Sequence, residues 1–407
     1  MKKILILIHS LSGGGAEKVA SWLSCALKHN VTICVCDKKP GICYDNCGNI
    51  IDLNIPGSNN LLKKIYYNIK KIIKVYNIKK SFKPDLTISF LETYNIVNVL
   101  TNFYGKAFLS IRDFKSLTVV NFANYGIIGI IHKYFIKLFY NKADKIITVS
   151  RGVLEDLKVN FKIRSTLLKV IYNPLKLDEI KKKSEEDIPV KYSFLNNKKF
   201  IINSGRLCYE KGQNHLIKIF KKIKEKNQEI KLVIMGIGDL KDELIDLSQK
   251  SGLKTFVFDQ NNNKKIDDYD IYFIGFQKNP FCFISKSKAF VFTSLQEGFP
   301  NALLEAMGCS VPLVSSDCDS GPREIMAPDT NIKQKTLLPE LTDCGFLMPI
   351  FNNNDNNETT YNIWADSIVS IINNEELKKN FTEGIKKIIN LFSEKIIADE
   401  WNKIINN

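Results

Sequence analysis

The chain lacks the features that mark a membrane-spanning protein or a small secreted scaffold. None of its 407 residues lies in an apolar run long enough to span a bilayer, which takes about 20 residues. The ten cysteines are scattered rather than set in a compact disulfide framework, so we expect free thiols in a reducing compartment. The start, MKKILILIHS, has no small-residue cleavage site, and we interpret it as a first β-strand rather than as a signal peptide.

Histidine is also scarce, which limits the metal centres that the chain could build. The four histidines lie far apart, at His9, His29, His132 and His215. Cys34-x-Cys36 with Cys43-x3-Cys47 lacks the C-x2-C pairs typical of zinc sites, and its first two cysteines fit a buried strand. We interpret Asp317-x-Asp319 as a turn feature. The sequence therefore predicts neither a metal nor a cofactor.

The charge of the chain is unbalanced. The 58 basic and 43 acidic residues give a formal net charge of +15. This excess favours anionic partners such as phosphates, nucleic acid or an acidic membrane, but a solvated lysine-rich surface explains it equally well. The basic residues are spread along the chain and no base-stacking motif accompanies them, so we expect no nucleic-acid partner.

Short apolar runs alternate with helical stretches twice along the chain, which predicts parallel sheets covered on both faces. The runs are 4–8, 31–35, 86–90, 107–111 and 145–149, then 200–204, 231–235, 271–275, 289–293 and 311–315. We expect an α/β fold of two Rossmann-like, doubly wound domains that face a central cleft. Their predicted bounds are 1–175 and 199–380, with a polar linker at 176–198 and a C-terminal helix at 381–407 that packs back on the first domain.

A glycine cluster follows the first predicted strand and opens a helix. Gly14 and Gly15 belong to the run GGGAE, where the main chain and the first helical amides could approach a phosphate. A tight turn without a ligand is the alternative. Asp37 has the spacing of a dinucleotide-binding acid, but Lys18 replaces the third glycine of G-x-G-x-x-G.

The segment EGFPNALLEAMG, which begins at Glu297, carries the stronger signal. It follows a buried strand directly, with Gly298 for an unusual turn and Pro300 suited to the first helical position. The amides from Phe299 to Ala302, Asn301 among them, would then bind an anion such as a diphosphate. Glu297 and Glu305 would accept hydrogen bonds from hydroxyl groups on either side of that anion. Arg206 and Lys211, which follow the strand 200–204, could neutralise the diphosphate.

These motifs resemble those of retaining glycosyltransferase family 4, which has the GT-B fold. EGFPNALLEAMGC is similar to its E-x7-E motif, and GRLCYEKG to its G-R-x4-K-G segment. GGGAE, ADKIITVS, IYNPL, FIGF and SGPREI also resemble the family, in family order along nearly the whole chain. The resemblance implies transfer of a sugar from a nucleotide-diphosphate donor by a reaction that needs no metal.

The resemblance also implies roles for single residues. Glu305 would hold the ribose hydroxyls of the donor and Glu297 the donor sugar, while Arg206 and Lys211 would grip the diphosphate. The main chain from Gly298 to Asn301 would contact sugar hydroxyls and phosphate. Gly275 and Phe276 would lie near the base, and Gly14 and Gly15 near the phosphates or the acceptor. Many members carry a histidine after the strand 107–111, where this chain has Arg112; we expect Arg112 to contact a phosphate or the acceptor instead.

Residues 61–83 form a basic amphipathic stretch with eight lysines and no acidic residue. Its apolar residues recur at helical spacing: Leu62, Ile65, Ile69, Ile72, Ile73 and Tyr76. Such a helix could lie on an anionic membrane or pack its apolar face into the core, and the sequence leaves both open. The apolar segment 126–140 has a similar character.

We therefore expect a cytoplasmic glycosyltransferase, peripheral on the inner face of the plasma membrane if residues 61–83 bind it. It would transfer a hexose or N-acetylhexosamine from a UDP-sugar to a lipid-linked glycan, as in lipopolysaccharide, O-antigen or capsule assembly. A GT-B epimerase or phosphorylase is one alternative. A non-enzymatic protein that binds nucleotides or nucleic acid is another.

Overall fold

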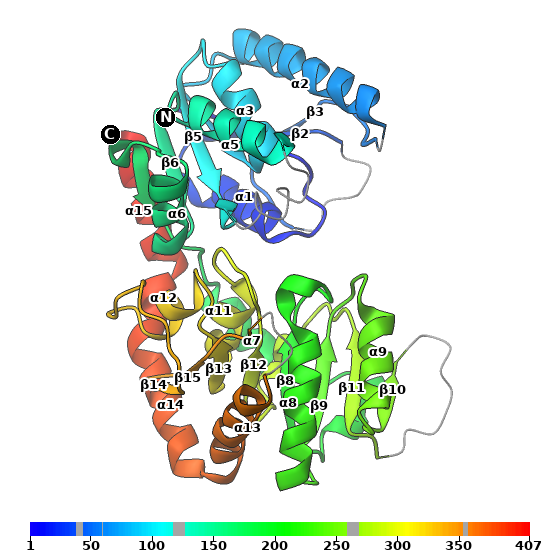
Figure 1. Ribbon diagram of the computed structural model, residues 1–407. Coiled ribbons are helices and arrows are strands. Elements are labelled where there is room, and N and C mark those ends of the chain that lie inside the picture. Colours follow the sequence, from blue (N-terminus) through cyan, green and yellow to red (C-terminus); the bar gives the residue numbers. More distant parts are fainter. Residues whose placement is uncertain (38–43, 59, 117–126, 259–267, 353–356) are drawn as a thin grey trace. The chain divides into compact units, whose positions relative to one another are not determined.

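The computed structural model describes residues 1–37, 44–58, 60–116, 127–258, 268–352 and 357–407 (Figure 1). The chain divides into two compact units. The first unit joins Met1–Pro174 to Glu394–Asn407, and the second unit is Leu175–Ser393.

The first unit is built on a seven-stranded sheet in the order β3-β2-β1-β4-β5-β6-β7, with every pair parallel. The strands are β1 (Lys3–Ile8), β2 (Asn30–Val35), β3 (Asn49–Asp52), β4 (Leu86–Phe90), β5 (Lys106–Ile111), β6 (Lys145–Thr148) and β7 (Leu168–Val170). The helices are α1 (Gly15–Ala26), α2 (Leu61–Phe82), α3 (Glu92–Leu100), α5 (Ile127–Tyr140), α6 (Arg151–Asn160), the 3-10 turn η1 (Ser165–Leu167) and α15 (Glu394–Asn406). The strand order reverses between β1 and β4, which makes the sheet doubly wound.

The second unit has an eight-stranded sheet in the order β10-β11-β9-β8-β12-β13-β15-β14, in which only β14 is antiparallel to its neighbour. The strands are β8 (Phe200–Ser204), β9 (Lys231–Met235), β10 (Thr255–Val257), β11 (Ile271–Gly275), β12 (Phe290–Phe292), β13 (Leu313–Ser316), β14 (Glu340–Thr342) and β15 (Gly345–Met348). The α-helices are α7 (Leu177–Ser184), α8 (Gln213–Lys226), α9 (Lys241–Lys250), α10 (Phe281–Ile284), α11 (Asn301–Gly308), α12 (Pro322–Met326), α13 (Glu358–Asn373) and α14 (Glu375–Ile388), and the 3-10 turns are η2 (Val190–Leu195), η3 (Tyr209–Lys211) and η4 (Ile389–Phe392). Here the strand order reverses between β8 and β12.

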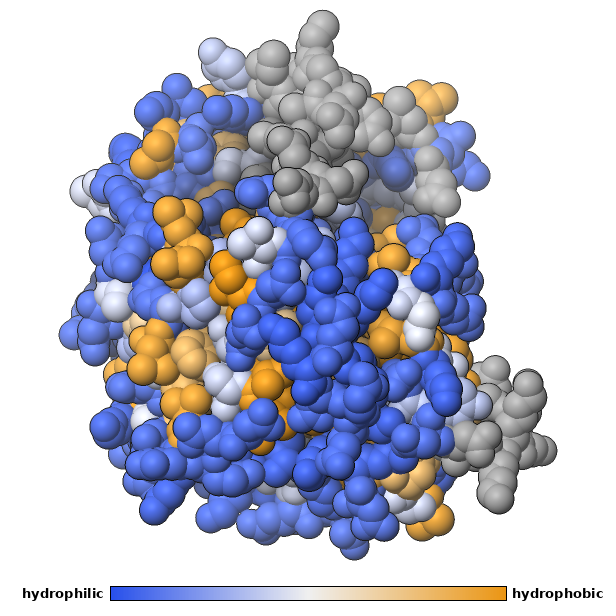
Figure 2. Space-filling model, turned by 60° about the horizontal axis from the view of Figure 1, so that its bottom comes forward, coloured by the Kyte–Doolittle hydropathy of each residue, from blue (hydrophilic) through white to orange (hydrophobic). Residues whose placement is uncertain are grey.

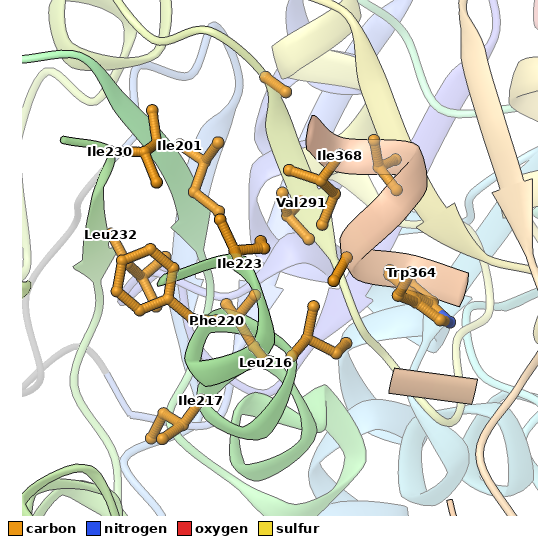
Figure 3. Close-up of a cluster of buried hydrophobic side chains, with 14 of the residues drawn as sticks. Ile201, Leu216, Ile217, Phe220, Ile223, Ile230, Leu232, Val291, Trp364 and Ile368 are labelled. Carbon is orange, nitrogen blue, oxygen red and sulfur yellow. The ribbon is translucent and has the colours of Figure 1, made fainter. Parts of the chain in front are cut away.

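Helices α8 and α13 pack on the second sheet around a large hydrophobic cluster (Figure 3). Phe220 and Ile223 of α8, Leu232 of β9 and Trp364 of α13 all belong to it. These side chains are fully removed from solvent, so the helix periodicity of α8 is set by the sheet beneath it.

All ten predicted strands form, but the domain boundaries differ from the prediction. Residues 176–198 were predicted to be a linker; they instead form α7 and η2 within the second unit. Apolar side chains anchor this segment: Ile180, Tyr192 and Leu195 are buried, and a β-carbon at Gly308 would lie 3.0 Å from Cδ1 of Ile180. One or two such residues per short helix are too sparse to give a recognisable apolar period.

The predicted C-terminal helix over 381–407 is two helices that belong to different units. Helix α14 and the turn η4 stay in the second unit, where the ring of Phe392 lies 5.7 Å from that of Phe299. After Ser393, α15 joins the first unit, and Trp401 is buried there in one cluster with Leu23 of α1.

The prediction of free thiols is wrong at one pair, because Cys25 and Cys47 form a disulfide. Polar contacts bring the loop before β3 onto α1: the amide of Cys47 donates to Ser24 Oγ at 3.1 Å, and Ser21 Oγ donates to the carbonyl of Asp45 at 2.6 Å. The two cysteines come from different elements, so their spacing gave no motif. Cys34 and Cys36 are buried thiols of β2 and its end, as predicted, whereas Cys43 lies outside the described residues.

Helix α2 has two apolar faces, so neither interpretation of residues 61–83 describes it alone. One face packs on the first unit's core through Val75, with Ile72 beside it. The other face exposes most of the predicted apolar stripe to solvent: Leu62 at 77%, Ile65 at 51%, Ile69 at 53% and Ile73 at 55%. Helix α5 exposes Tyr134, Phe135 and Leu138 in the same way.

The face of the molecule shown in Figure 2 is more polar than these two exposed helix faces. The face shown in Figure 2 is mostly hydrophilic, and its hydrophobic residues form small separate patches. Among the described helices, none combines the length and apolar character needed to cross a membrane.

Candidate functional site

The loops after β8 and β12 meet at the point where the strand order of the second sheet reverses. In a doubly wound sheet this is where ligands bind, beyond the carboxyl ends of the strands. Lys211, from the loop after β8, places its Nζ 2.5 Å from Oε1 of Glu297, from the loop after β12. The main chains also join, since the amide of Leu295 donates to the carbonyl of Glu210 at 2.8 Å. The structure thus brings together two side chains that the sequence places 86 residues apart.

Gly212 makes this close approach possible. Its φ is +61°, and a β-carbon there would lie 2.2 Å from the carbonyl oxygen of Thr293. A larger residue would push the two loops apart and carry Lys211 with it. The Lys211 ammonium also lies 5.4 Å from the ring centre of Phe292, so the cation is held against an aromatic face.

The loop Gly298–Pro300 turns the chain from β12 into α11. The helix begins at Asn301, one residue after the predicted position, so Pro300 is its N-cap. The loop after β13 supports this turn through a hydrogen bond. Ser320 Oγ donates to the carbonyl of Gly298 at 2.6 Å. At Gly321 the φ is +93°, and a β-carbon would lie 2.4 Å from Pro300 Cδ.

The first turn of α11 therefore has a fixed direction at the same sheet edge as Lys211. Amides at a helix N-terminus favour an anion, and those of Ala302 and Leu303 have no acceptor within the helix. Glu305 follows one turn later and is half-buried. A cation, a helix N-terminus and two carboxylates side by side suit a ligand that carries both phosphate and hydroxyl groups.

Asp317 supports the site from within rather than binding a ligand. It is 1% exposed, and both of its carboxylate oxygens accept from Arg323, at 3.1 and 2.6 Å. Arg323 also donates to Glu340 at 2.9 and 2.7 Å. The other acid of the D-x-D, Asp319, pairs with Lys335 at 3.1 Å. The interpretation of this D-x-D as a turn feature fits these contacts.

The remaining predicted residues of the second unit lie along the same edge. Arg206 follows β8 and is exposed, with its carbonyl accepting from Gln213 Nε2 at 3.0 Å. Gly275 ends β11 with a φ of +67°, and Phe276 after it is 72% exposed. These positions bring an exposed cation and an exposed aromatic ring to the ends of β8 and β11, on either side of β9, which suits a nucleotide.

Two glycines of this edge went unnoticed in the sequence. Gly236 and Gly238 follow β9, and β-carbons there would lie 1.8 Å from the carbonyl oxygen of Gly205 and 2.2 Å from that of Leu207. The amide of Gly236 also donates to the carbonyl of Gly275 at 2.9 Å. A G-x-G directly after a buried strand was the available signal, and its effect is to keep side chains off the middle of the edge.

The glycine loop of the first unit leads directly into helix α1. Gly14 caps α1, and a β-carbon there would lie 2.1 Å from Oε2 of Glu17. Glu17 is the third residue of the helix, and the bare main chain of Gly14 makes room for its carboxylate. Gly15 is the first helical residue and is exposed.

Arg112 lies at the carboxyl edge of the first sheet, after β5. Its Nη1 donates to Asn173 Oδ1 at 2.8 Å, and its guanidinium carbon lies 5.4 Å from the ring centre of Phe90, at the end of β4. Its Nε and Nη2 are buried and have no hydrogen-bond acceptor among the residues that the structure describes. Burial without a counter-charge lowers the pKa of Arg112 to about 9.

Comparison with known proteins identifies relatives of this chain. Residues 184–340 match the family described as "Glycosyl transferases group 1". An uncharacterized glycosyltransferase of Methanocaldococcus jannaschii is 33% identical over 362 residues, which is 86% of each chain. The N-acetylgalactosamine-N,N'-diacetylbacillosaminyl-diphospho-undecaprenol 4-alpha-N-acetylgalactosaminyltransferase of Campylobacter jejuni is 32% identical over 335 residues, which is 81% of this chain and 84% of that one.

Among solved structures, the HepE protein of Anabaena in complex with UDP and glucose has a TM-score of 0.73 at 16% identity and full coverage of both chains. This likeness, together with the two parallel-rich α/β sheets, shows the GT-B fold. Because a relative of one-third identity covers most of the chain, the protein belongs to the group 1 glycosyltransferases and is an enzyme of sugar transfer.

Proposed function

We propose that this glycosyltransferase moves a hexose or N-acetylhexosamine from a UDP-sugar to a lipid-linked glycan of a bacterial surface polysaccharide, with retention of the anomeric configuration. The observation that carries the proposal is the Lys211–Glu297 contact at the strand reversal of the second sheet, beside the N-terminus of α11. The likeness to a structure containing UDP and glucose supports the donor class. The Campylobacter relative, whose name contains a diphospho-undecaprenol, supports the acceptor class.

In this proposal Lys211 exchanges partners when the donor binds. The ammonium leaves Glu297 for the diphosphate, and the carboxylate becomes free to accept from a hydroxyl of the donor sugar. Charge builds on the diphosphate as the sugar–phosphate bond breaks, so Lys211, Arg206 and the α11 amides stabilise the transition state more than the ground state. Glu305 accepts from the ribose hydroxyls, and the departing phosphate takes the proton of the acceptor hydroxyl.

We further propose that no metal takes part in this step. Support comes from the two cationic side chains at the site, since Lys211 and Arg206 supply the charge that a divalent ion would otherwise bring. Chelation with EDTA is therefore expected to leave turnover unchanged. A loss of turnover that Mg²⁺ or Mn²⁺ restores would contradict this part of the proposal.

Calorimetric titration with UDP, GDP and ADP tests the donor. We expect UDP to bind most tightly, and Lys211→Met and Glu305→Ala each to weaken it by about tenfold or more. Lys218→Met, which removes a cation from helix α8, is the matched control. Absence of binding by all three nucleotides would refute the proposal, and NMR of the product's anomeric proton would test retention.

The exposed face of α2 supports attachment to an anionic membrane on its cytoplasmic side. Four apolar side chains and no acidic residue face outward among the lysines of this helix. Flotation with vesicles that contain phosphatidylglycerol, at low salt, tests the attachment. We expect Ile65→Glu with Ile69→Glu to abolish flotation, whereas Leu337→Glu, at an 84% exposed leucine of the second unit, leaves it unchanged. Equal flotation of all three proteins would overturn it.

The cytoplasmic location has an independent test in the disulfide. Cys25 and Cys47 are both exposed, so a reducing cytoplasm would keep them as thiols. Alkylation with a maleimide in intact cells, followed by mass spectrometry, is expected to label both cysteines. A protein isolated with this pair unlabelled and oxidised would contradict the location.

A further inference from the structure

Arg112 differs from Lys115, a buried cation at the same sheet edge, because no acid of the described residues lies within ion-pair distance of it. Lys115 is 3% exposed, and its ammonium pairs with Asp113 at 2.9 Å and Glu92 at 3.3 Å. Arg112, three residues earlier, has one hydrogen bond within the described part of the chain, to the neutral amide of Asn173. Among the described residues, no carboxylate lies within ion-pair distance of its guanidinium. A buried charge of this kind is costly unless an anion neutralises it.

The position of Arg112 in the sheet is that of a ligand-binding residue. The arginine follows β5, its ring partner Phe90 ends β4, and its hydrogen-bond partner Asn173 follows β7. These contacts place the three residues at the carboxyl edge of the sheet, where β4, β5 and β7 end. Helix α6 begins at Arg151, three residues after β6 ends at Thr148, so its positive N-terminal end lies at this same edge.

The unpaired donors define the chemistry of the ligand. Asn173 holds Nη1 and the ring of Phe90 packs against the guanidinium, so the orientation of the fork is fixed. Nε and Nη2 remain without an acceptor, and together they form the edge of the guanidinium that binds two oxygens of one anion. A phosphate group fits this edge through its paired oxygens. A single hydroxyl would leave one of the two donors unsatisfied.

From this geometry we infer that Arg112 is a phosphate receptor of the first unit and binds the diphosphate of a lipid-linked acceptor. The inference rests on the proposed function and names the group by which the acceptor is recognised. The second unit supplies its own cation, Lys211, at its own strand reversal, so the first unit's arginine is left for the acceptor. Asn173 is the positioning residue, because its side-chain oxygen accepts a hydrogen bond from Nη1 of the arginine.

Calorimetric titration of the full chain with inorganic pyrophosphate, in the presence of saturating UDP, tests the receptor. Saturating UDP occupies the nucleotide site, so the remaining pyrophosphate affinity reports on Arg112. We expect Arg112→Met to weaken pyrophosphate binding by about tenfold or more. The pyrophosphate affinity of Arg112→Lys should fall between those of the wild type and Arg112→Met. An ammonium is a point charge and lacks the paired donors of a guanidinium. Arg164→Met removes an exposed arginine of the same unit and should bind pyrophosphate like the wild type.

Farnesyl diphosphate separates a lipid-linked group from a free one. We expect it to bind more tightly than inorganic pyrophosphate and to lose its affinity in Arg112→Met; weaker binding than pyrophosphate would overturn the lipid-linked assignment. Wild-type pyrophosphate affinity in Arg112→Met would overturn the receptor, as would an equal loss of UDP affinity, which assigns the arginine to the donor. Failure of the wild type to bind UDP refutes the proposed function instead.

Unfolding temperature and kinetics distinguish this binding role of Arg112 from a purely structural one. Arg112→Met should unfold at the same temperature as the wild type or higher, because it removes a buried charge without a counter-ion. With a diphosphate-linked acceptor, the KM should rise while kcat changes little, since the arginine binds a group remote from the reacting hydroxyl. A lowered unfolding temperature with KM unchanged would overturn the inference.

Discussion

Lys79 of helix α2 makes the stability of the first unit depend on pH. The side chain is completely buried, and its ammonium donates to Asn98 Oδ1 at 2.7 Å and to the carbonyl of Asn98 at 3.1 Å. No ion pair joins it to a carboxylate in the described part of the chain. Burial lowers the pKa of Lys79 from its ordinary value of 10.5 to about 7.

The direction and size of the effect follow from proton linkage. Between about pH 7 and pH 10 the unfolded chain holds a proton on Lys79 that the folded chain has released, so stability rises with pH across this window. The slope is at most about 1.4 kcal/mol per pH unit, and the whole rise is about 5 kcal/mol. Below about pH 7 both states are protonated, and the full cost of burying the charge is present.

The effect of Lys79→Met on the free energy of unfolding should therefore change sign with pH. It removes the buried charge but leaves Asn98 Oδ1 without a donor, which costs about 1–3 kcal/mol. We expect the variant to be more stable than the wild type by about 2–4 kcal/mol near pH 6, and less stable by about 1–2 kcal/mol near pH 10.

Urea denaturation followed by tryptophan fluorescence measures this effect in the first unit. Trp22 and Trp401 both lie there, and a Trp364→Phe background removes the third tryptophan of the chain. Lys80→Met, at the exposed neighbouring lysine, should keep the pH slope of the wild type. The reasoning is refuted if Lys79→Met and the wild type keep a constant difference in free energy of unfolding from pH 6 to pH 10.

Three further changes test the packing around the two sites. Gly212→Ala places a β-carbon against a carbonyl oxygen of the neighbouring loop and should lower UDP affinity by about tenfold or more in calorimetry; wild-type affinity would contradict the account of that loop. Arg323→Met leaves Asp317 buried without its partner, and chemical denaturation should show a loss of about 3–5 kcal/mol, whereas an unchanged midpoint would mean that the pair adds nothing. Cys25→Ser opens the loop closed by Cys47, and the oxidised protein should lose about 3 kcal/mol of stability, a loss that dithiothreitol reproduces in the wild type and not in the variant.

The sequence predicted the strands that are buried on both faces, because each appears as an unbroken apolar run, as β1 and β9 do. It did not predict β3, β7, β10 or the pair β14 and β15. These strands are short and lie at or next to sheet edges, and β3 and β7 have no fully buried residue. Half-buried strands of three or four residues give too few alternations to stand out from loops.

The candidate site, too, was predicted from the sequence only in part. Motif spacing identified Lys211 and Glu297, because both lie in short segments with recognisable glycines. The contact between them depends on how the strand order reverses, which spacing does not contain. Likewise, the family resemblance implies a histidine where this chain has Arg112, but the surroundings of its guanidinium come from Phe90 of β4 and from Asn173, which follows β7.

The position of α15 has a consequence for the order in which the protein is made. The ribosome synthesises residues 1–174 first, yet the core that contains Leu23 is completed by Trp401 and Ile405. Those residues emerge only after the entire second unit, which has its own core and no missing element. The nascent chain therefore finishes its second unit before its first, the reverse of the usual N-to-C order of domain folding. Until α15 is synthesised, the surface of α1 that it will cover stays open to chaperones.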